Sequence, residues 1–303
     1  MTYIRLIDAV RDAMREEMAA NSRVIVIGQD IGVNGGVFRV TEGFYDEFGP
    51  DRVIDSPLAE SGLVGVAIGA ALNGLRPVVE IQFADFIFPA FNQIVSEAAL
   101  LYYRSNGEYP VPLVIRAPYG GGIHGGLYHS QSVEAFFSHV PGLKVVIPSN
   151  PYDAKGLLKQ SIRDNNPVLY FEHKGAYNMV KGKVPDDDFA VPIGQASVPR
   201  QGSDITLISY GLPVHHCLET AVALETEGIS CEVVDLRTVK PLDTATVLAS
   251  VKKTGKACIV HEDNLTGGVG AEVAAFPYSP GLEAAVLPGP EDVIWAVRKL
   301  AAY

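Results

Sequence analysis

Residues 52–81 read RVIDSPLAESGLVGVAIGAALNGLRPVVEI, which is a β-branched run, an apolar segment rich in Gly and Ala, and a second β-branched run. Short β-branched runs bounded by turn residues are typical of buried strands. The apolar segment from 62 to 72 is longer than a usual strand and has the length of a helix. The order strand, helix, strand predicts parallel strands with a helix packed against them.

The same alternation continues on both sides of this stretch. Helical periodicity occurs at residues 6–18, at 91–101 and, in the second half, at 214–227. Further strands are expected at residues 24–27, 113–116, 143–147, 168–171, 205–209, 231–236 and 257–261. The sequence therefore predicts an α/β fold of mostly parallel sheets, each flanked by helices on both faces.

The pattern is interrupted once, and we place a domain boundary there. After Phe171 the chain becomes polar and irregular, and the strand and helix pattern resumes at Asp204. Stretches of this composition commonly connect domains. We expect a first domain at residues 1–180, a linker at 181–203 and a second α/β domain at 204–303.

Composition and charge exclude several classes of protein. The chain has 24 Lys and Arg against 35 Asp and Glu, and it lacks the basic clusters that nucleic-acid binding requires. Apolar runs such as 64–72 and 81–91 are interrupted well before the about 20 residues of a membrane span. With no leader pattern, a cytoplasmic protein is expected. Cys217, Cys231 and Cys258 have no metal or disulfide spacing and are interpreted as reduced packing residues.

Glu60 is the first candidate functional residue. It follows a strand and precedes the apolar helix, so a simple interpretation is a first-turn carboxylate that complements the helix dipole. The segment from 62 to 72 is too apolar for a surface helix, which predicts that Glu60 lies at the buried end of a buried helix. A buried carboxylate needs a partner, and a protonatable ring nitrogen of a ligand would be a strong one.

His129 is the second candidate. It lies between a glycine-rich loop and a predicted helix at 134–137, where α/β folds commonly collect functional groups, and a structural histidine is the alternative. His124, His139 and His173 lack such a setting.

The glycine-rich loop before His129 contains the pattern G-x-G-x-x-G at Gly120, Gly122 and Gly125. It does not have the context of a dinucleotide site, because the loop continues before any helix begins. Its glycines do indicate that the backbone passes close to another group.

Two further stretches are ambiguous from the residues alone. Residues 164–167, DNNP, are ordinary turn formers, and a loop whose oxygens hold a hard cation is the alternative. Residues 267–275 begin like a helix after three glycines, but Phe276 and Pro277 end it almost at once. A helix this short would cover a sheet poorly.

Taken together, several motifs resemble one family, the beta subunits of thiamine-diphosphate-dependent 2-oxo acid dehydrogenases. The motifs are GQDIG at 28–32, GGVF at 35–38, DSPLAE at 55–60, EIQFADFIFP at 80–89, HSQS at 129–132, PSNPYDAKG at 148–156, VDLRT at 234–238 and PLD at 241–243. The resemblance runs from about residue 4 to 275 and implies a transketolase-like pyrimidine-binding domain followed by a transketolase C-terminal domain.

The resemblance assigns roles to these candidates. Glu60 would hydrogen-bond the aminopyrimidine nitrogen of thiamine diphosphate and drive its activation. His129 would face the substrate and assist acyl transfer to a lipoyl group. The matching cofactor positions are Asp30, Leu58, Glu60, Gln82 and Phe86, with Phe86 standing where relatives often have Tyr.

The resemblance also implies partners and metals. An alpha subunit would complete a two-alpha two-beta heterotetramer and hold the diphosphate and magnesium, and a lipoyl-bearing acyltransferase would receive the acyl group. A structural potassium ion would be held, largely by backbone oxygens, at Leu113, Ser161, Ile162, Asp164 and Asn166. Under this resemblance the DNNP stretch is a cation loop.

The substrate and the activity leave alternatives open. The motifs around 83–91 and 129–132 are more similar to branched-chain 2-oxo acid enzymes than to bacterial pyruvate enzymes, and pyruvate and acetoin types remain alternatives. A beta-like interaction subunit without catalytic activity is another alternative. A transketolase-like synthase complete in one chain is a further one, but it would need a diphosphate-binding half, which this sequence lacks. Between Ala275 and Phe276 the chain departs from the family, whose members continue through the helix and a further strand.

Overall fold

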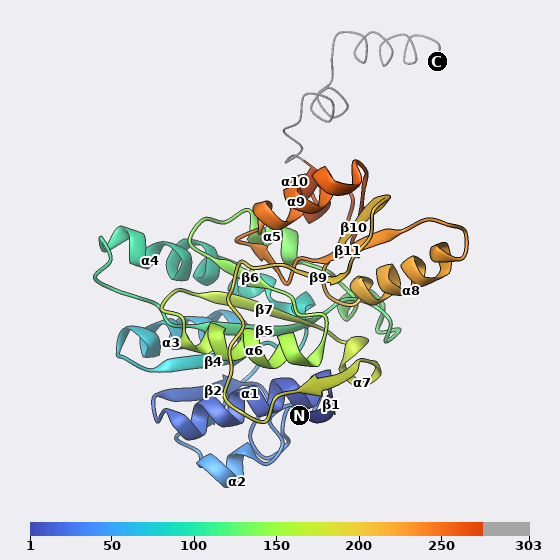
Figure 1. The fold of residues 1–303 in the computed structure, drawn as a ribbon. Helices are drawn as coiled ribbons and strands as arrows, with labels where there is room; N and C mark the ends of the chain where they lie inside the picture. Colours follow the sequence, from blue (N-terminus) through green and yellow to red (C-terminus); the bar gives the residue numbers. More distant parts are fainter. Residues whose placement is uncertain (275–303) are drawn as a thin grey trace.

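The computed structural model describes residues 1–274, and its centre is a seven-stranded sheet with the strand order β12-β6-β7-β5-β4-β2-β3 (Figure 1). Its strands are β2 (Val24–Gly28), β3 (Val53–Asp55), β4 (Arg76–Glu80), β5 (Val114–Tyr119), β6 (Lys144–Val146), β7 (Val168–His173) and β12 (Thr238–Lys240). All neighbours are parallel except β12, which is antiparallel to β6. The mostly parallel sheet that the alternation predicted is confirmed.

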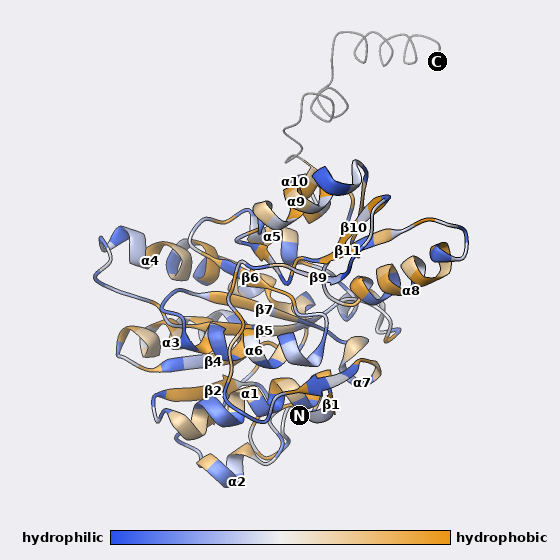
Figure 2. Cartoon of the chain, in the orientation of Figure 1, coloured by the Kyte–Doolittle hydropathy of each residue, from blue (hydrophilic) through white to orange (hydrophobic). Residues whose placement is uncertain are grey.

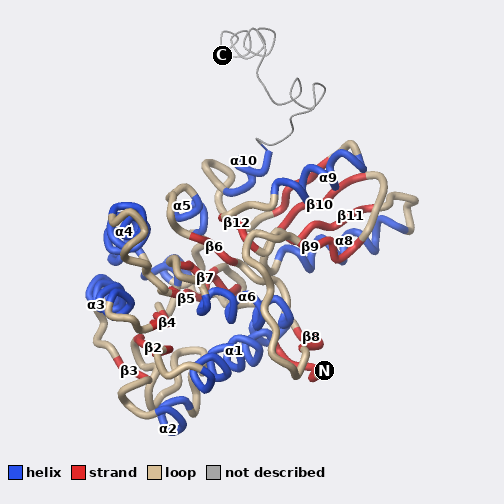
Figure 3. Tube along the Cα trace, turned by 60° about the vertical axis from the view of Figure 1, so that its left-hand side comes forward, coloured by secondary structure: helices blue, strands red, loops and turns tan. Residues whose placement is uncertain are grey.

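Helices cover both faces of this sheet. Figure 3 shows α3 (Glu60–Leu72) and α4 (Ala99–Arg104) on one side and α1 (Leu6–Ala20) and α6 (Pro151–Arg163) on the other. Successive strand residues point to opposite faces, so Val78 packs in the core under α1 and α6 while Val79 packs in the core under α3. The central strands are buried on both faces, so their sequences are mainly apolar; Figure 2 shows β2 largely in orange, whereas other strands also contain charged residues, such as Glu80 in β4 and Arg116 in β5.

The remaining helical elements are short. They are α2 (Phe44–Phe48), the 3₁₀ turns Ala84–Phe86, Phe88–Ala90 and Gly126–Tyr128, the π-helix Gln93–Ala98, α5 (Glu134–Ser138) and α7 (Ala176–Met179). The expected helix at 91–101 is therefore present as a π-helix that continues into α4.

A second sheet has the strand order β13-β10-β11-β9. Its elements are β9 (Ser197–Arg200), β10 (Ile205–Ser209), α8 (Pro213–Glu225), β11 (Cys231–Asp235), α9 (Thr244–Thr254), β13 (Ala257–Val260) and α10 (Val269–Ala274). Apolar residues of this half, among them Val234, Val247 and Val269, belong to the same core as α3. The two halves of the chain therefore share packed apolar surface.

Four strands were not expected from the sequence, and all of them pair antiparallel. β1 (Thr2–Arg5) pairs with β8 (Lys181–Val184), β9 lies at the edge of the second sheet, and β12 lies at the edge of the first. Strands of three or four residues at an edge show no hydrophobic period, so pattern reasoning misses them. The predicted linker at 181–203 contains β8 and β9, and the domain limits stay a prediction.

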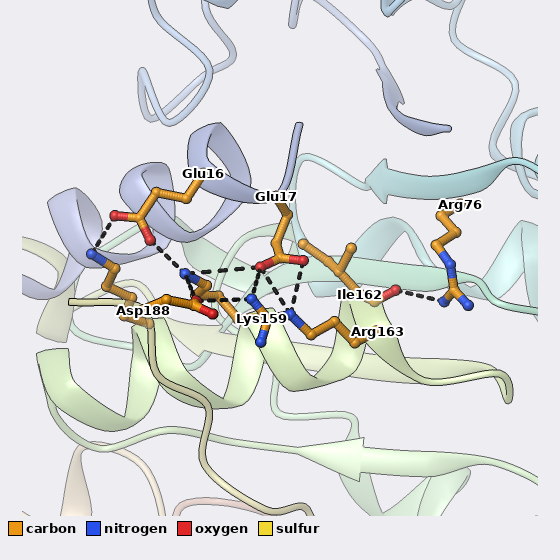
Figure 4. Close-up of polar contacts among 8 residues, drawn as sticks. Glu16, Glu17, Arg76, Lys159, Ile162, Arg163 and Asp188 are labelled. Atoms are coloured by element: carbon orange, nitrogen blue, oxygen red, sulfur yellow. Dashed lines mark hydrogen bonds and ion pairs between the residues drawn. The ribbon is translucent and has the colours of Figure 1, made fainter. Parts of the chain in front are cut away.

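Helices α1 and α6 are joined by an ion-pair network (Figure 4). Glu16 accepts from Lys155 and Lys159 at 2.6 and 2.5 Å, and Glu17 accepts from Arg163 at 2.6 Å. The Lys159 side chain is almost fully buried, so its ammonium depends on these carboxylates. The network fixes the position of the C-terminal end of α6.

One face of α3 differs from its prediction. The helix buries Leu63, Val64 and Ala67, but Val66 is 63% exposed. The sequence predicted burial on all sides, and within the described chain only one side is covered. The exposed side is apolar, which makes it a candidate contact surface.

The C-terminal prediction falls partly outside the described residues. The short helix expected after the glycines is α10, Val269–Ala274, and the expected absent segment after Ala275 lies outside the described residues. Among residues 1–274, no helix has the length and apolar character needed to cross a membrane.

Candidate active site at the carboxyl ends of parallel strands

The predicted site residues follow four strands that are neighbours in the sheet, β3, β2, β4 and β5. Glu60 follows β3, Asp30 follows β2, Gln82 and Phe86 follow β4, and His129 follows β5. Because parallel strands end at the same edge, their loops meet there. The sheet order thus gathers at one edge residues that are up to 99 positions apart in the sequence.

Two of the predicted cofactor residues contact each other. Gln82 Nε2 donates a hydrogen bond to Asp30 Oδ2 at 3.2 Å. Asp30 has a positive φ of 58°, a conformation that Asp tolerates better than most residues and that aims its side chain across the edge of the sheet. The pair presents amide and carboxylate atoms at the edge, which suits a polar ring.

Aromatic side chains form a wall beside this pair. The His129 ring packs edge-on against Phe83 and Phe86, with centroids 4.6 and 5.5 Å apart, and Phe83 also packs against Phe38 at 5.4 Å. His129 and Phe86, both predicted site residues, are therefore in contact. Phe83 was not predicted, although it lies between Gln82 and Phe86 in the motif.

The tautomer of His129 follows from the contact of its ring with a backbone carbonyl. Nδ1 lies 3.1 Å from the carbonyl oxygen of Gly125, and a carbonyl can only accept. Nδ1 therefore carries the proton, and Nε2 is the atom that can take or release a proton at the edge of the sheet. A Cβ at Gly125 would lie 2.4 Å from His129 Cβ, so this glycine is required for the approach. The close group that the glycine pattern indicated is, at this position, His129 itself.

The loop at residues 120–131 is held by two carboxylates. Asp85 Oδ1 accepts from the N–H groups of Ser130 and Gln131, both at 3.1 Å. Glu262, which follows β13 in the second half, accepts from Gly121 N–H at 2.5 Å. The loop with the candidate histidine is thus tied to both halves of the chain.

His173 also belongs to this arrangement, contrary to the prediction that its setting is unremarkable. Its Nε2 lies 2.5 Å from Glu262 Oε2, and its Nδ1 accepts from Gly175 N–H at 3.1 Å. A Cβ at Gly120 would lie 2.3 Å from its ring, so the loop begins directly on this buried histidine. Sequence reasoning overlooked it because it lies at the end of a buried strand and not in a loop.

Lys174 is a buried ammonium behind the aromatic wall. Its Nζ lies 5.6 Å from the centroid of the Phe83 ring and donates to Pro118 O at 3.4 Å. Burial lowers the pKa of Lys174 to about 8, while the charges of Asp85 and Glu262 act in the opposite direction. The lysine therefore supplies positive charge between the two carboxylates that hold the loop.

Glu60 is the first residue of α3 and is only partly buried. No hydrogen-bond or ion-pair partner for its carboxylate occurs within residues 1–274, and the neighbouring Leu58 side chain is 70% exposed. The prediction of a buried carboxylate is therefore wrong for this chain by itself. The side chain is free to receive a partner from outside, as activation of a ring nitrogen would require.

The predicted potassium residues lie at the opposite edge, where the strands begin. Leu113 precedes β5, and Ser161, Ile162, Asp164 and Asn166 precede β7. Asn166 N–H donates to Asp164 Oδ1 at 2.9 Å, so the stretch forms the turn that composition favoured. Arg76 and Lys144 both contact this turn, which places two positive side chains at the predicted cation site.

Comparison with known proteins defines the class first. Residues 3–180 match the family described as transketolase, pyrimidine binding domain, and residues 194–288 match the transketolase C-terminal domain. A solved structure described as split gene transketolase, inactive beta4 tetramer, has a TM-score of 0.76 at 25% identity over 91% of this chain and 86% of that chain. The two transketolase-like domains expected from the resemblance are confirmed.

The relatives define the family more narrowly. The 2-oxoisovalerate dehydrogenase subunit beta of Bacillus subtilis is 52% identical over the full length of both chains. The pyruvate dehydrogenase E1 component subunit beta of the same organism is 44% identical, again over both full lengths. This chain belongs to the family of 2-oxo acid dehydrogenase beta subunits.

The alignment with the 2-oxoisovalerate dehydrogenase subunit is relevant to the expectation that this chain lacks a segment after Ala275. It extends over 327 positions, whereas the chain has 303 residues, so residues of the relative have no counterpart here. A pyruvate dehydrogenase relative from Staphylococcus epidermidis aligns over 275 residues, 91% of this chain, at 50% identity.

Proposed function

We propose that this chain is the beta subunit of the decarboxylating component of a branched-chain 2-oxo acid dehydrogenase complex. The supporting observation is the edge of the large sheet, where Glu60, which has no partner among residues 1–274, lies with the Asp30 and Gln82 pair and His129 at the ends of four neighbouring parallel strands. The names of the 2-oxoisovalerate and pyruvate dehydrogenase relatives support the same reaction class.

The site residues suit thiamine diphosphate, which when bound supplies the carbanion chemistry that side chains lack. Glu60 would exchange a proton with a nitrogen of the pyrimidine ring. Asp30, Gln82 and Phe86 would hold the ring, and the exposed Leu58 would contact it. The diphosphate and its magnesium would be held by an alpha subunit, because the glycine-rich loop of this chain packs on His173 and His129.

His129 would act in the transfer of the acyl group to a lipoyl domain. Its Nε2 has no partner within the described residues, and an imidazole nitrogen is a common general acid or base in enzymes. Edge-on contacts with Phe83 and Phe86 fix the orientation of the His129 ring at the edge of the sheet. The imidazole would thus be placed to exchange a proton with a thiol of the lipoyl group.

Exposed apolar side chains support an alpha partner. Val66 on α3 is exposed, and Leu127 in the His129 loop is 80% exposed. Exposed apolar surface of this kind marks protein contacts. A two-alpha two-beta assembly, a lipoyl-bearing acyltransferase partner and a cytoplasmic location remain parts of the proposal. Structural potassium is not included, because Arg76 and Lys144 already stand at its predicted ligands.

The test is co-expression with an alpha subunit encoded in the same genome. The assembly should decarboxylate 2-oxoisovalerate with a kcat/KM at least tenfold above that for pyruvate. Preference for pyruvate would replace the branched-chain assignment by the pyruvate type. An assembly that forms but turns over neither acid would favour the non-catalytic interaction subunit.

The isolated chain provides a second test. It has residues for the pyrimidine ring but, in our proposal, none for the diphosphate, so it should bind thiamine diphosphate only weakly. Calorimetry on the purified chain should show no micromolar binding with or without magnesium. Micromolar binding by the chain alone would contradict the assignment of the diphosphate to an alpha subunit.

A further inference from the structure

The loop at residues 120–131 depends on contacts from outside itself. Gly120 N–H donates to Gln131 O at 2.9 Å and closes the base of the loop. Gly122 and Gly126 have positive φ, and no atom lies within 4 Å of a Cβ built at either position. Glycine backbone without neighbours is conformationally free, so contacts at the ends of the loop contribute to the position of His129, beside the contacts of its ring with Phe83 and Phe86.

Glu262 holds the first end of the loop with both carboxylate oxygens. Oε1 accepts from Gly121 N–H and Oε2 from His173 Nε2, each at 2.5 Å. His173 Nδ1 already accepts from Gly175 N–H, so in the neutral ring the proton lies on Nε2 and points at Glu262. Every donor in this chain of contacts has one acceptor.

The contact joins residues 141 positions apart in the sequence. Glu262 follows β13 of the second sheet, and Gly121 follows β5 of the first. Burial acts to raise the pKa of Glu262, but the hydrogen bonds from His173 and Gly121 outweigh burial. The net effect is a lowered pKa, so the carboxyl stays ionised. A charged acceptor gives a stronger bond to a backbone N–H than a neutral one.

We propose that Glu262 is a positioning residue for His129. By holding Gly121 and His173, it couples the seating of the second domain to the placement of the imidazole at the edge of the first sheet. The role in acyl transfer rests on the proposed function, whereas the anchoring of the loop does not.

The anchoring is tested on the full chain by hydrogen exchange of peptides covering residues 119–131. Glu262→Ala should raise exchange of Gly121 and its neighbours at least tenfold, and Glu262→Gln should raise it less, because its amide oxygen can still accept. The matched control is Glu225→Ala, which removes a glutamate of the same domain that pairs with Arg200 on the surface. Unchanged loop exchange in Glu262→Ala would overturn the proposal, whatever the activity.

The consequence for His129 is tested in the assembly with an alpha subunit. In Glu262→Ala, transfer to a lipoyl domain should fall about tenfold, while decarboxylation followed with an artificial electron acceptor falls less than threefold. Partial recovery in Glu262→Gln would support positioning through the Gly121 bond. A loosened loop with unchanged transfer would overturn the positioning role. An inactive wild-type assembly would instead count against the proposed function.

A second inference comes from the opposite edge of the sheet. Arg76, the first residue of β4, donates from NH1 to the carbonyl oxygens of Ile162 at 2.9 Å and Asp164 at 2.8 Å, and from NH2 to Asn165 Oδ1 at 2.7 Å (Figure 4 shows the Ile162 bond). Ile162 and Asp164 are two of the residues predicted to hold potassium. Lys144 Nζ also contacts the Asp164 carboxylate.

The carbonyl oxygens of two other predicted ligands also accept hydrogen bonds. Leu113 O accepts from Val168 N–H at 2.8 Å, and Ser161 O accepts from Asp164 N–H at 3.2 Å. A metal ion here would have to share these oxygens and approach two positive side chains. Carbonyl groups at a helix C-terminus attract a cation, and a guanidinium can supply that charge from within the chain.

We infer that Arg76 performs in this chain the structural role that a potassium ion would perform, so that its fold does not depend on potassium. Arg52 offers a matched control. Its guanidinium donates to the carbonyls of Val24, Met18 and Asn21 at 2.7 to 3.1 Å at the end of α1, where no metal site was predicted.

The experiment compares thermal unfolding of the full chain in potassium chloride and in choline chloride at equal ionic strength. The wild type should have the same Tm in both salts. Arg76→Met should lower Tm and regain several degrees in potassium only, and Arg52→Met should lower Tm equally in both salts. If Arg76→Met does not fold, the comparison of the wild-type Tm in the two salts still tests whether the fold depends on potassium. A saturable rise of the wild-type Tm specific to potassium, or an Arg76→Met variant as stable as wild type, would overturn the inference.

Discussion

The two candidate catalytic residues lie at the same edge of the sheet in opposite settings. His129 contacts Phe83, Phe86 and the Gly125 carbonyl, and its loop is held by two carboxylates. Glu60 begins α3 beside the exposed Leu58, with no side-chain partner in the described part of the chain. The position of His129 is therefore preorganised by this chain, whereas the Glu60 carboxylate would need a partner from outside it.

This difference indicates which candidate residue is positioned by this chain and which would be positioned by a partner. Preorganisation requires neighbours that restrict a side chain, and residues 1–274 supply such neighbours for His129 but no side-chain partner for Glu60. Glu60 lies at the N-terminal end of α3, on the side of the buried Leu63 and Val64, and the exposed Leu58 leaves this end open, so a partner that covered the end would also enclose the carboxylate. A change at Glu60 should therefore leave the isolated chain unaltered, whereas changes around His129 should be detectable in the chain alone.

The largest effect is expected for Glu60→Gln. An amide cannot exchange the proton that activation of the cofactor requires, so decarboxylation by the assembly should fall by about 10²-fold or more. The Tm of the isolated chain should not change, because the carboxylate has no partner in the part of the chain that the structure describes. Glu219→Gln on α8 is the control. Decarboxylation near the wild-type rate would remove Glu60 from the mechanism.

The second effect concerns His129→Ala. Without Nε2 to take up or release a proton, transfer of the acyl group to a lipoyl domain should fall by about 10²-fold, and decarboxylation with an artificial electron acceptor should fall much less. His124→Ala, in the same loop but exposed, should change neither rate. Equal losses in both assays would mean that His129 acts before acyl transfer, against the assigned role.

A smaller effect is expected for Asp85→Asn, which tests the second anchor of the loop. The amide oxygen can still accept from Ser130 and Gln131, but a bond to a neutral acceptor is weaker by about 1 kcal/mol. Acyl transfer should therefore fall by several fold, and loop exchange near residue 130 should increase. Asp46→Asn on the surface of α2 serves as the control. No change in exchange would show that Asp85 does not restrain the loop.

The smallest effect concerns the pH dependence of stability. Burial raises the pKa of Glu134 to about 7, the charge of Asp263 adds to this, and the hydrogen bond from Tyr210 opposes it. The folded chain keeps a proton that the unfolded chain releases near pH 4.5, so stability falls as the pH rises from about 4.5 to 7.

Glu134→Gln should remove that part of the decline, which amounts to roughly 2–3 kcal/mol at most. The measurement is the free energy of unfolding in urea at pH 5 and pH 8 for wild type and variant. Asp235, whose pKa burial also raises to about 7, is present in both proteins and cancels in the comparison. An identical decline in the two proteins would show that Glu134 is already ionised in the fold.

The sequence by itself determined the fold class and predicted the sheet edge at which the candidate site lies. Parallel strands buried on both faces need mainly apolar runs, and those runs are visible at 24–27, 77–81 and 168–171 without any structure. The motifs containing Glu60, Gln82 and His129 follow such runs, and parallel strands end at one edge. These features depend on local pattern, so pattern reasoning found them.

Only the tertiary structure decided which groups hold the site in place. The pairing of Gly121 with Glu262 and of Arg76 with Ile162 joins segments 141 and 86 positions apart, and the register that brings them together comes from packing of whole elements. The edge strands β1, β8, β9 and β12 were missed for the same reason, because their pairing partners, not their own residues, make them strands. A contact between distant segments leaves no period in either one, so its chemistry becomes visible only when the chain is folded.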